Sequence, residues 1–150
     1  MKVSRNKLFF FILFAVCILV GCDQKAEQNK TEVIELSLKS DDQKMAEAFA
    51  SQTSNIWVES QGIVEKILPD DREGSAHQRF IVRLSTGQTL LISHNIDVAP
   101  RVADLQAGQP VHFRGEYEWN AKGGVIHWTH HDPSGHQSGG WIEYKGKRYQ

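Results

Sequence analysis

The sequence predicts a mainly β protein whose folded part is one small five-stranded barrel. Three observations lead to this prediction. The last two thirds of the 150-residue chain contain five short segments rich in β-branched and aromatic residues, some with clear alternation of apolar and polar side chains. Clusters of Gly, Pro, Asp and Ser separate these segments. The length from residue 55 to residue 150 suits a single domain.

The first three predicted strands form a meander. Gly62–Leu68 is followed by the turn Pro-Asp-Asp, and His77–Leu84 alternates between a polar and an apolar face. A tight turn, Ser85–Gln88, then returns the chain as the third strand, Thr89–Ser93. These three segments are expected to pair in sequence order.

The pairing of the second and third strands decides which side chains share a face. With Leu84 opposite Thr89, His77 and His94 become diagonal neighbours on one face of the predicted sheet. Cross-strand pairs of this kind are most often structural, so this pair is not assigned a function.

A short helix is predicted at Pro100–Gln106, with Asp97 upstream and Gly108 as its stop. Val111–Trp119 is the fourth strand and Val125–His131 the fifth, with a Gly-rich turn between them. Three strands, a helix and two more strands is the order of the OB-fold, a partly open five-stranded barrel. A generic small β-barrel or sandwich is the alternative.

An N-terminal helix is predicted over residues 40–53, ahead of the barrel. Ser40 can cap it, Gln43 completes a capping box, and Asp41 and Asp42 suit its positive end. Its narrow apolar face consists of Met45, Ala46 and Phe49. The helix is expected to pack on the barrel or to remain semi-independent.

The first 21 residues have the architecture of an export signal. A basic start precedes an apolar run from residue 8 to residue 20, shorter than the roughly 20 residues that a spanning helix needs. A true transmembrane anchor is the alternative. The string Leu-Val-Gly-Cys resembles the bacterial lipobox, and by that resemblance Cys22 carries the lipid. Residues 22–39 are polar and are predicted to be a tether between the membrane and the domain.

These features predict a lipid-anchored protein of the cell envelope that faces the periplasm. Asp23 resembles the enterobacterial signal for retention at the inner membrane. Removal of the signal takes away Cys17 and three basic residues, which leaves 14 basic against 18 acidic residues and no free thiol. Disulfides and thiolate metal sites are thereby excluded. With this negative net charge, the protein also lacks the broad basic surface that is expected of a general nucleic-acid binder.

Several strings of residues resemble a bacterial family of small exported proteins that is catalogued only as a domain of unknown function. The resemblance covers about Gly62 to Gln150. Its strings are Leu68–Asp71, His77–Phe80, His94–Asp97, Gly115–Asn120 and Gly123–Pro133. The family has no established activity, so the resemblance implies no catalytic residue. A weaker resemblance, to thermonuclease-type OB barrels, is at the level of fold only.

A dense histidine cluster near the end of the chain predicts a metal site. His127, His131 and His136, with Asp132 as a ligand or as a group that orients one, would suit zinc, nickel or copper. The Asp-Pro-Ser-Gly turn can redirect the chain within this run. The spacing matches no standard zinc signature. The alternative is that these histidines lie on the surface or pack across strands.

Four aromatic residues are candidates for a stacking platform that binds bases or sugars: Tyr117, Trp119, Trp128 and Trp141. The alternative is that they belong to the core or cover the barrel edges. Two functional hypotheses follow. The first is a binding module for a small ligand, an oligosaccharide, an oligonucleotide or another envelope protein. The second is a metal-dependent hydrolase, acting for example on phosphodiesters through a metal-bound water. Binding ranks first because no recognised catalytic spacing is present, and whether the protein is an enzyme stays open.

Overall fold

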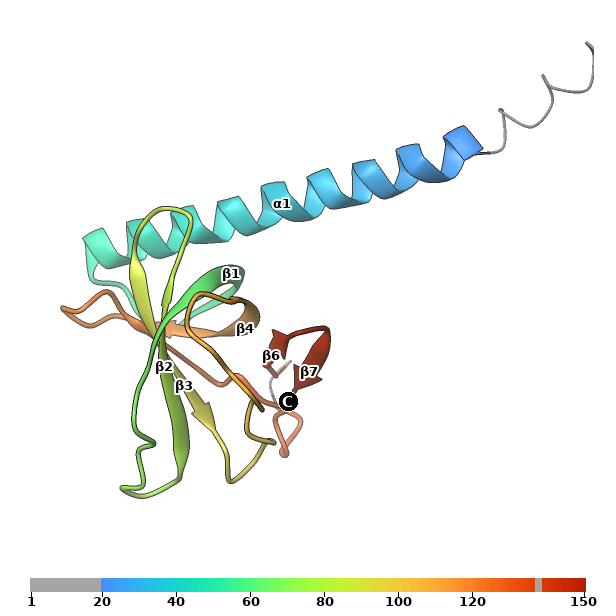
Figure 1. Cartoon of the computed structure of the whole chain (residues 1–150). Helices are drawn as coiled ribbons and strands as arrows, with labels where there is room; N and C mark the ends of the chain where they lie inside the picture. The colour runs from blue at the N-terminus through green and yellow to red at the C-terminus, as the bar shows by residue number, and fades with distance from the viewer. Residues whose placement is uncertain (1–19, 137–138) are drawn as a thin grey trace, which may run out of the picture. The chain divides into compact units, whose positions relative to one another are not determined.

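The structure, a computed structural model, describes residues 20–136 and 139–150 (Figure 1). One helix precedes seven strands. These elements are α1 (Val20–Ser51), β1 (Ile56–Ile67), β2 (His77–Arg83), β3 (Thr89–Asn95), β4 (Pro110–Glu118), β5 (Val125–His127), β6 (Trp141–Tyr144) and β7 (Lys147–Tyr149). Residues 37–150, which contain the end of α1 and all the strands, form one compact unit. Among the described residues, no helix is both long and apolar enough to cross a membrane.

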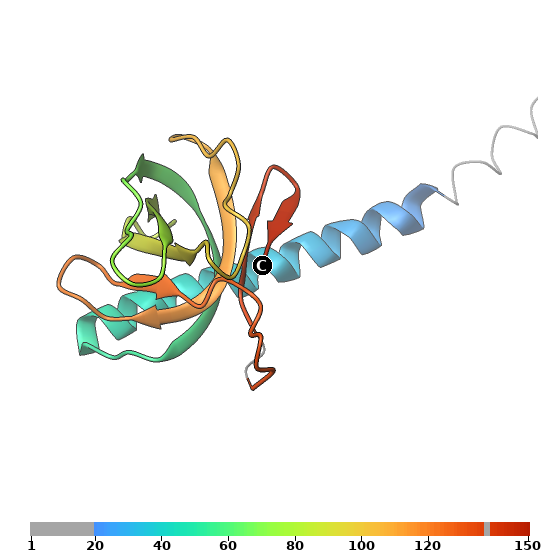
Figure 2. The same cartoon turned by 90° about the horizontal axis from the view of Figure 1, so that it is seen from below.

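Strands β1 to β5 close into a barrel. Neighbouring strands follow the order β1-β2-β3-β5-β4, and β4 pairs with β1 again to complete the circuit. The pairings are antiparallel except that between β3 and β5, which is parallel. The mainly β, OB-like barrel predicted from the sequence is therefore confirmed. Figure 2 shows the C-terminal hairpin β6–β7 running outside the barrel, where β6 pairs with β4.

The core lies inside the barrel because every second side chain of each strand points inward. The largest fully buried residues of the barrel strands include Tyr117, Phe80, Phe113, Leu90, Ile92 and Ile126, and Met45 of α1 and Ile142 of β6 are buried with them. Gly115 faces the same interior beneath β5, where a Cβ atom would lie 2.5 Å from the His127 carbonyl oxygen and 2.7 Å from Ile126. Only glycine allows β4 and β5 to approach this closely.

The N-terminal helix is longer than predicted. It runs without interruption through Ser40, which is therefore not its N-cap, and residues 22–39, which were predicted to be a polar tether, are helical. The sequence from residue 23 to residue 61 contains neither Gly nor Pro and is rich in good helix formers, so nothing stops the helix there. It ends in a Schellman motif. Gln52 has φ 55°, its N–H bonds the Phe49 carbonyl at 3.3 Å, and the Thr53 N–H bonds the Ala48 carbonyl at 2.9 Å.

The end of α1 is fastened to the barrel by two acids. Asp41 accepts the Glu59 N–H at 2.8 Å. The buried carboxylate of Asp42 accepts hydrogen bonds from the Ser60 hydroxyl and from the Ser85 N–H and hydroxyl, the last two at 3.2 and 2.5 Å. Met45 and Ala48 enter the core on the same side of the helix. The two acids were predicted to stabilise a helix start, whereas the structure uses them to dock the helix.

The helix predicted at Pro100–Gln106 does not form, and this segment is irregular apart from a turn at residues 103–104. Asp104 has φ 51°, which an α-helix does not tolerate. The backbone groups of this segment are instead bound by side chains of β2 and β6. Gln78 bonds both the N–H and the carbonyl of Val102, at 2.8 and 3.1 Å, and the Tyr144 hydroxyl donates to the Asp104 carbonyl at 3.1 Å.

Candidate ligand-binding cleft

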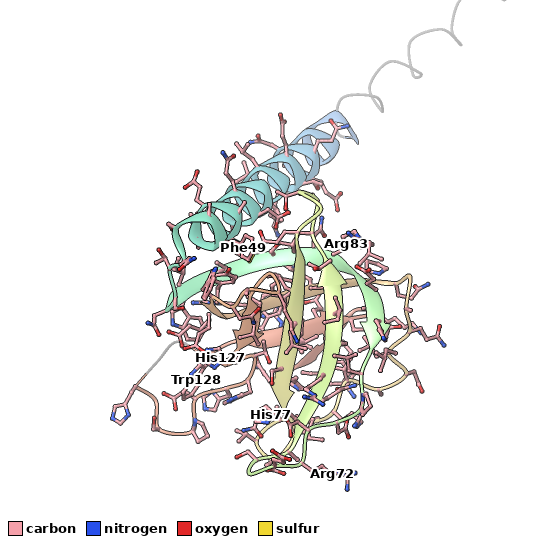
Figure 3. The ribbon with its side chains drawn as sticks, turned by 90° about the vertical axis from the view of Figure 1, so that its left-hand side faces the viewer. Phe49, Arg72, His77, Arg83, His127 and Trp128 are labelled. Carbon is pink, nitrogen blue, oxygen red and sulfur yellow. The ribbon has the colours of Figure 1, made fainter. Side chains whose placement is uncertain are left out.

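An open cleft of about 470 Å³ lies where β2 begins and where β3 and β5 end. Its lining residues are Ser75, His77, Ser93, Asn95, Val98, His127, Trp128, His130, Asp132, Pro133 and Ser134. Figure 3 shows His77, His127 and Trp128 on the same side of the barrel. Of these described lining residues, none is a lysine or an arginine. Apolar and polar side chains both line the cleft, and Asp132 is the only carboxylate among them.

The strand register places the polar residues in this cleft. His77 pairs with Asn95, and Arg79 pairs with Ser93, so the outward side chains of β2 and β3 form one surface. Strand β5 runs parallel to β3 and adds His127 to the same outer surface. The inward side chains of β2 and β3 alternate with these outward ones and fill the barrel interior. The outward side chains are half-buried at the mouth of the cleft.

The assumed register of the β2–β3 hairpin was wrong by one residue. Arg83, not Leu84, pairs with Thr89, because Leu84 belongs to the turn and its N–H bonds the Gln88 carbonyl at 2.9 Å. A shift of one residue moves a side chain to the other face of a sheet. His77 therefore lines the outer cleft, while His94 lies inside the barrel and is fully buried.

Trp128 forms one wall of the cleft. Strand β5 ends at His127 because Trp128 adopts φ 55°, a conformation outside the strand region. The Trp128 ring lies beside the His130 ring, with centroids 5.4 Å apart and planes tilted by 33°. Of the four predicted platform aromatics, only Trp128 lines this cleft.

The other three aromatics have different surroundings. Tyr117 is fully buried in the core, and burial raises the pKa of its hydroxyl. The Trp119 indole donates to the Phe49 carbonyl at 3.1 Å, and Trp141 is covered by Arg148 at 3.9 Å from its ring. These residues therefore do not form a single platform with Trp128. Their positions match the alternative prediction, in which the aromatic residues belong to the core or cover the barrel edges.

His127 occupies an unusual position between two carboxylates of β4. Its Nε2 lies 3.9 Å from Glu116 and 3.8 Å from Glu118, too far for a direct hydrogen bond. Among the described atoms, this buried nitrogen has no hydrogen-bond partner. The side chain itself is 31% exposed and contributes the edge of the cleft next to Trp128.

The structure does not bring the predicted metal ligands together. His127 and Asp132 line the cleft, whereas His131 and His136 are exposed, and His136 is bonded to the Ser134 hydroxyl at 2.9 Å. In the described ranges, no group of three or more His, Cys, Asp or Glu residues is arranged to hold a metal ion. Metal binding by this set stays a prediction.

Sequence reasoning missed several cleft residues. Ser93 and Asn95 were not among the predicted site residues. His130 was left out of the predicted metal site because, on a fifth strand that continued to His131, it would face away from His127. The signal that could have found the first two was the alternation of β3 itself, once its register with β2 was correct. The positive φ of Trp128 has no comparable signal in the sequence.

The chain belongs to a family described as a protein of unknown function (DUF3465), whose model matches residues 30–150. The predicted membership of a family of unknown function is therefore confirmed. No curated protein matches the chain. The description of this family gives no activity.

Proposed function

We propose that this protein is a lipid-anchored envelope protein whose OB-like barrel binds a ligand in the cleft between β2, β3 and β5. The observation that carries the proposal is the cleft itself. A half-buried tryptophan and several neutral hydrogen-bonding side chains converge there on an open volume of about 470 Å³. Ligand sites combine apolar or aromatic walls with a few placed polar groups in this way.

The position of the cleft supports the proposal. OB-folds bind oligonucleotides and oligosaccharides on the face of strands 2 and 3, with help from the loop between strands 1 and 2. Here β2 and β3 supply His77, Ser93 and Asn95, and Ser75 comes from the β1–β2 loop. Fold alone does not establish function, but here the side chains at this place are also suited to binding. Within the described residues, the hydrolase hypothesis has no comparable observation in its favour.

The membrane anchor is part of the same proposal. Its support is the order of basic, apolar and lipobox segments in the first 22 residues. The signal lies largely outside the described residues, and the side chain of Cys22 is not described.

A fragment screen tests the proposal. Small-molecule fragments are mixed with the purified full-length protein, and backbone and indole N–H signals are followed by NMR. We expect the fragments to shift the signals of residues 93–95 and 127–134. Trp128→Ala should lose this binding, whereas the control Trp57→Ala, on β1 outside the cleft, should keep it. If the fragments shift other regions only, or bind both variants equally, the cleft is not a ligand site.

A further inference from the structure

Two histidines of the cleft are fixed in one tautomer by backbone carbonyls. His77 Nδ1 lies 2.8 Å from the Ser75 carbonyl oxygen, and His130 Nδ1 lies 2.7 Å from the His131 carbonyl oxygen. A carbonyl oxygen only accepts hydrogen bonds, so each Nδ1 must carry the hydrogen. In a neutral ring, Nε2 is then left with a lone pair that accepts. In the neutral form, Nε2 of each of these two histidines can therefore accept a hydrogen bond from a ligand.

Asn95 is oriented by the same kind of argument. One of its side-chain polar atoms lies 2.9 Å from the Asp97 N–H, which is a donor, so that atom is the amide oxygen. The NH₂ group of Asn95 therefore remains as a donor at the cleft. The hydroxyl of neighbouring Ser93 can donate and accept.

The charge of the cleft argues against an anionic ligand. The described lining contains no lysine or arginine, and its single carboxylate, Asp132, accepts hydrogen bonds from the Ser134 N–H and hydroxyl at 2.9 and 2.6 Å. Phosphate and carboxylate ligands accept hydrogen bonds and are usually met by arginine, lysine or clustered N–H groups. When these two imidazole rings are neutral, their Nε2 lone pairs and the Asp132 carboxylate do not favour an anion.

A hydroxyl-rich neutral molecule fits all of these groups. Sugar hydroxyls donate to imidazole nitrogens and accept from an amide NH₂ group, and the C–H face of a sugar ring can pack on Trp128. We infer that the cleft selects a neutral ligand of the carbohydrate class, with His77 and His130 as the acceptors that determine specificity. The inference rests on the proposed ligand-binding function and adds to it the chemical class of the ligand.

Calorimetry with defined probes tests the inference. Full-length protein is titrated with maltotriose, cellotriose and chitotriose, and separately with inorganic phosphate and glycerol 3-phosphate, at about pH 8, where an ordinary imidazole is neutral. At least one trisaccharide should bind with a Kd of about 1 mM or tighter. Its affinity should be unchanged between low and high salt, because no charge pairing contributes.

Variants connect this binding to the proposed acceptors. His77→Phe keeps a ring but removes the acceptor and should weaken trisaccharide binding about 5- to 10-fold. His77→Gln, which can present an oxygen near the same place, should recover part of the loss. His112→Phe, on β4 outside the cleft, is the matched control and should bind like the parent.

The outcomes separate the two proposals. Binding of phosphate but of no trisaccharide, with NMR shifts at the cleft, overturns the carbohydrate class and leaves the ligand-binding function standing. Trisaccharide binding that is unaffected by His77→Phe overturns the role of the acceptors. If neither trisaccharides nor phosphates bind, the carbohydrate class is overturned. The fragment screen described above then shows whether the cleft binds any ligand.

Discussion

The imidazole of His94, buried in the barrel, lies 2.9 Å from the Thr129 hydroxyl through Nδ1. Its Nε2 lies 3.1 Å from the Pro100 carbonyl oxygen, which only accepts, so Nε2 carries the hydrogen and Nδ1 accepts from Thr129. Thr129 stands between two cleft residues, and Pro100 follows the loop that contains Val98. One neutral side chain thus joins the two segments that border the cleft.

Acid should weaken this structure through His94. Burial holds the pKa of His94 below its usual value of 6.5; the hydrogen bond to Pro100 opposes this effect, and nearby His130 and His77 add to it. Below about pH 6.5 the unfolded chain therefore binds a proton that the folded state resists. Above about pH 6.5, the contribution of His94 to the free energy of unfolding is present in full. It is lost as the pH falls from there through the lower pKa of the folded state, with a slope of at most about 1.4 kcal/mol per pH unit.

Urea unfolding between about pH 8 and pH 5 measures this effect. His94→Gln should lower the free energy of unfolding by about 1–3 kcal/mol at pH 8, because the flexible Gln amide does not hold its oxygen and NH₂ group at the positions of the two ring nitrogens, so a buried hydrogen bond to Thr129 or Pro100 is lost. The variant should also lose the part of the pH dependence that belongs to His94. The exposed His131→Gln serves as the control. Parallel curves for parent and His94→Gln over the whole range would show that His94 does not carry the acid sensitivity.

Removal of the Asp42 carboxylate should loosen the end of α1. Asp42 is buried and accepts three hydrogen bonds, from the Ser60 hydroxyl and from the N–H and hydroxyl of Ser85. Asp42→Ala leaves these donors without an acceptor and should reduce the free energy of unfolding by about 2–4 kcal/mol. The exposed Glu47→Ala, on the same helix, should change it by less than about 0.5 kcal/mol. Equal effects of the two substitutions in thermal and urea unfolding would contradict this role.

The strands of the barrel could be predicted because their alternation is local. The second strand was predicted at His77–Leu84 and is found at His77–Arg83. The fifth was predicted to reach His131 but ends at His127, where Trp128 turns the chain, and next to this turn the Thr129 hydroxyl bonds His94, 35 residues away in the sequence, at 2.9 Å. Such long-range contacts leave no periodic signal.

The β6–β7 hairpin had a local signal that was overlooked. Its strands flank Lys145 and Gly146, which have φ 50° and 72°, the pair of positive φ values that a two-residue type I′ hairpin turn requires. No strand was predicted for this segment from the sequence. The register of β2 and β3 was missed for another reason. Whether Leu84 belongs to the strand or the turn depends on its burial in the finished core, which the sequence does not show.

Lipidation at Cys22 is tested by cell fractionation. The parent should be found in the membrane fraction as a processed protein, because the lipid holds the mature chain there. Cys22→Ser should remain unprocessed, since the residue that resembles the lipobox cysteine is missing, whereas Cys17→Ser should behave like the parent. Processing and membrane retention of Cys22→Ser to the same extent as the parent would refute the lipoprotein proposal.

Metal binding remains to be tested at the histidine-rich turn. In the described structure, His131 and His136 are exposed and do not converge with His127, so binding would require this turn to rearrange around Asp132. If the sequence prediction is right, metal-free full-length protein titrated with zinc, nickel or copper binds one ion with a Kd below about 100 μM, and His131→Ala weakens it. Acidification should also weaken it, because ligating imidazoles must be neutral. His77→Ala is the control, since His77 lies outside the predicted ligand set. No binding in this range, or equal binding by His131→Ala, would leave these histidines as surface residues and the cleft as the only candidate site among the described residues.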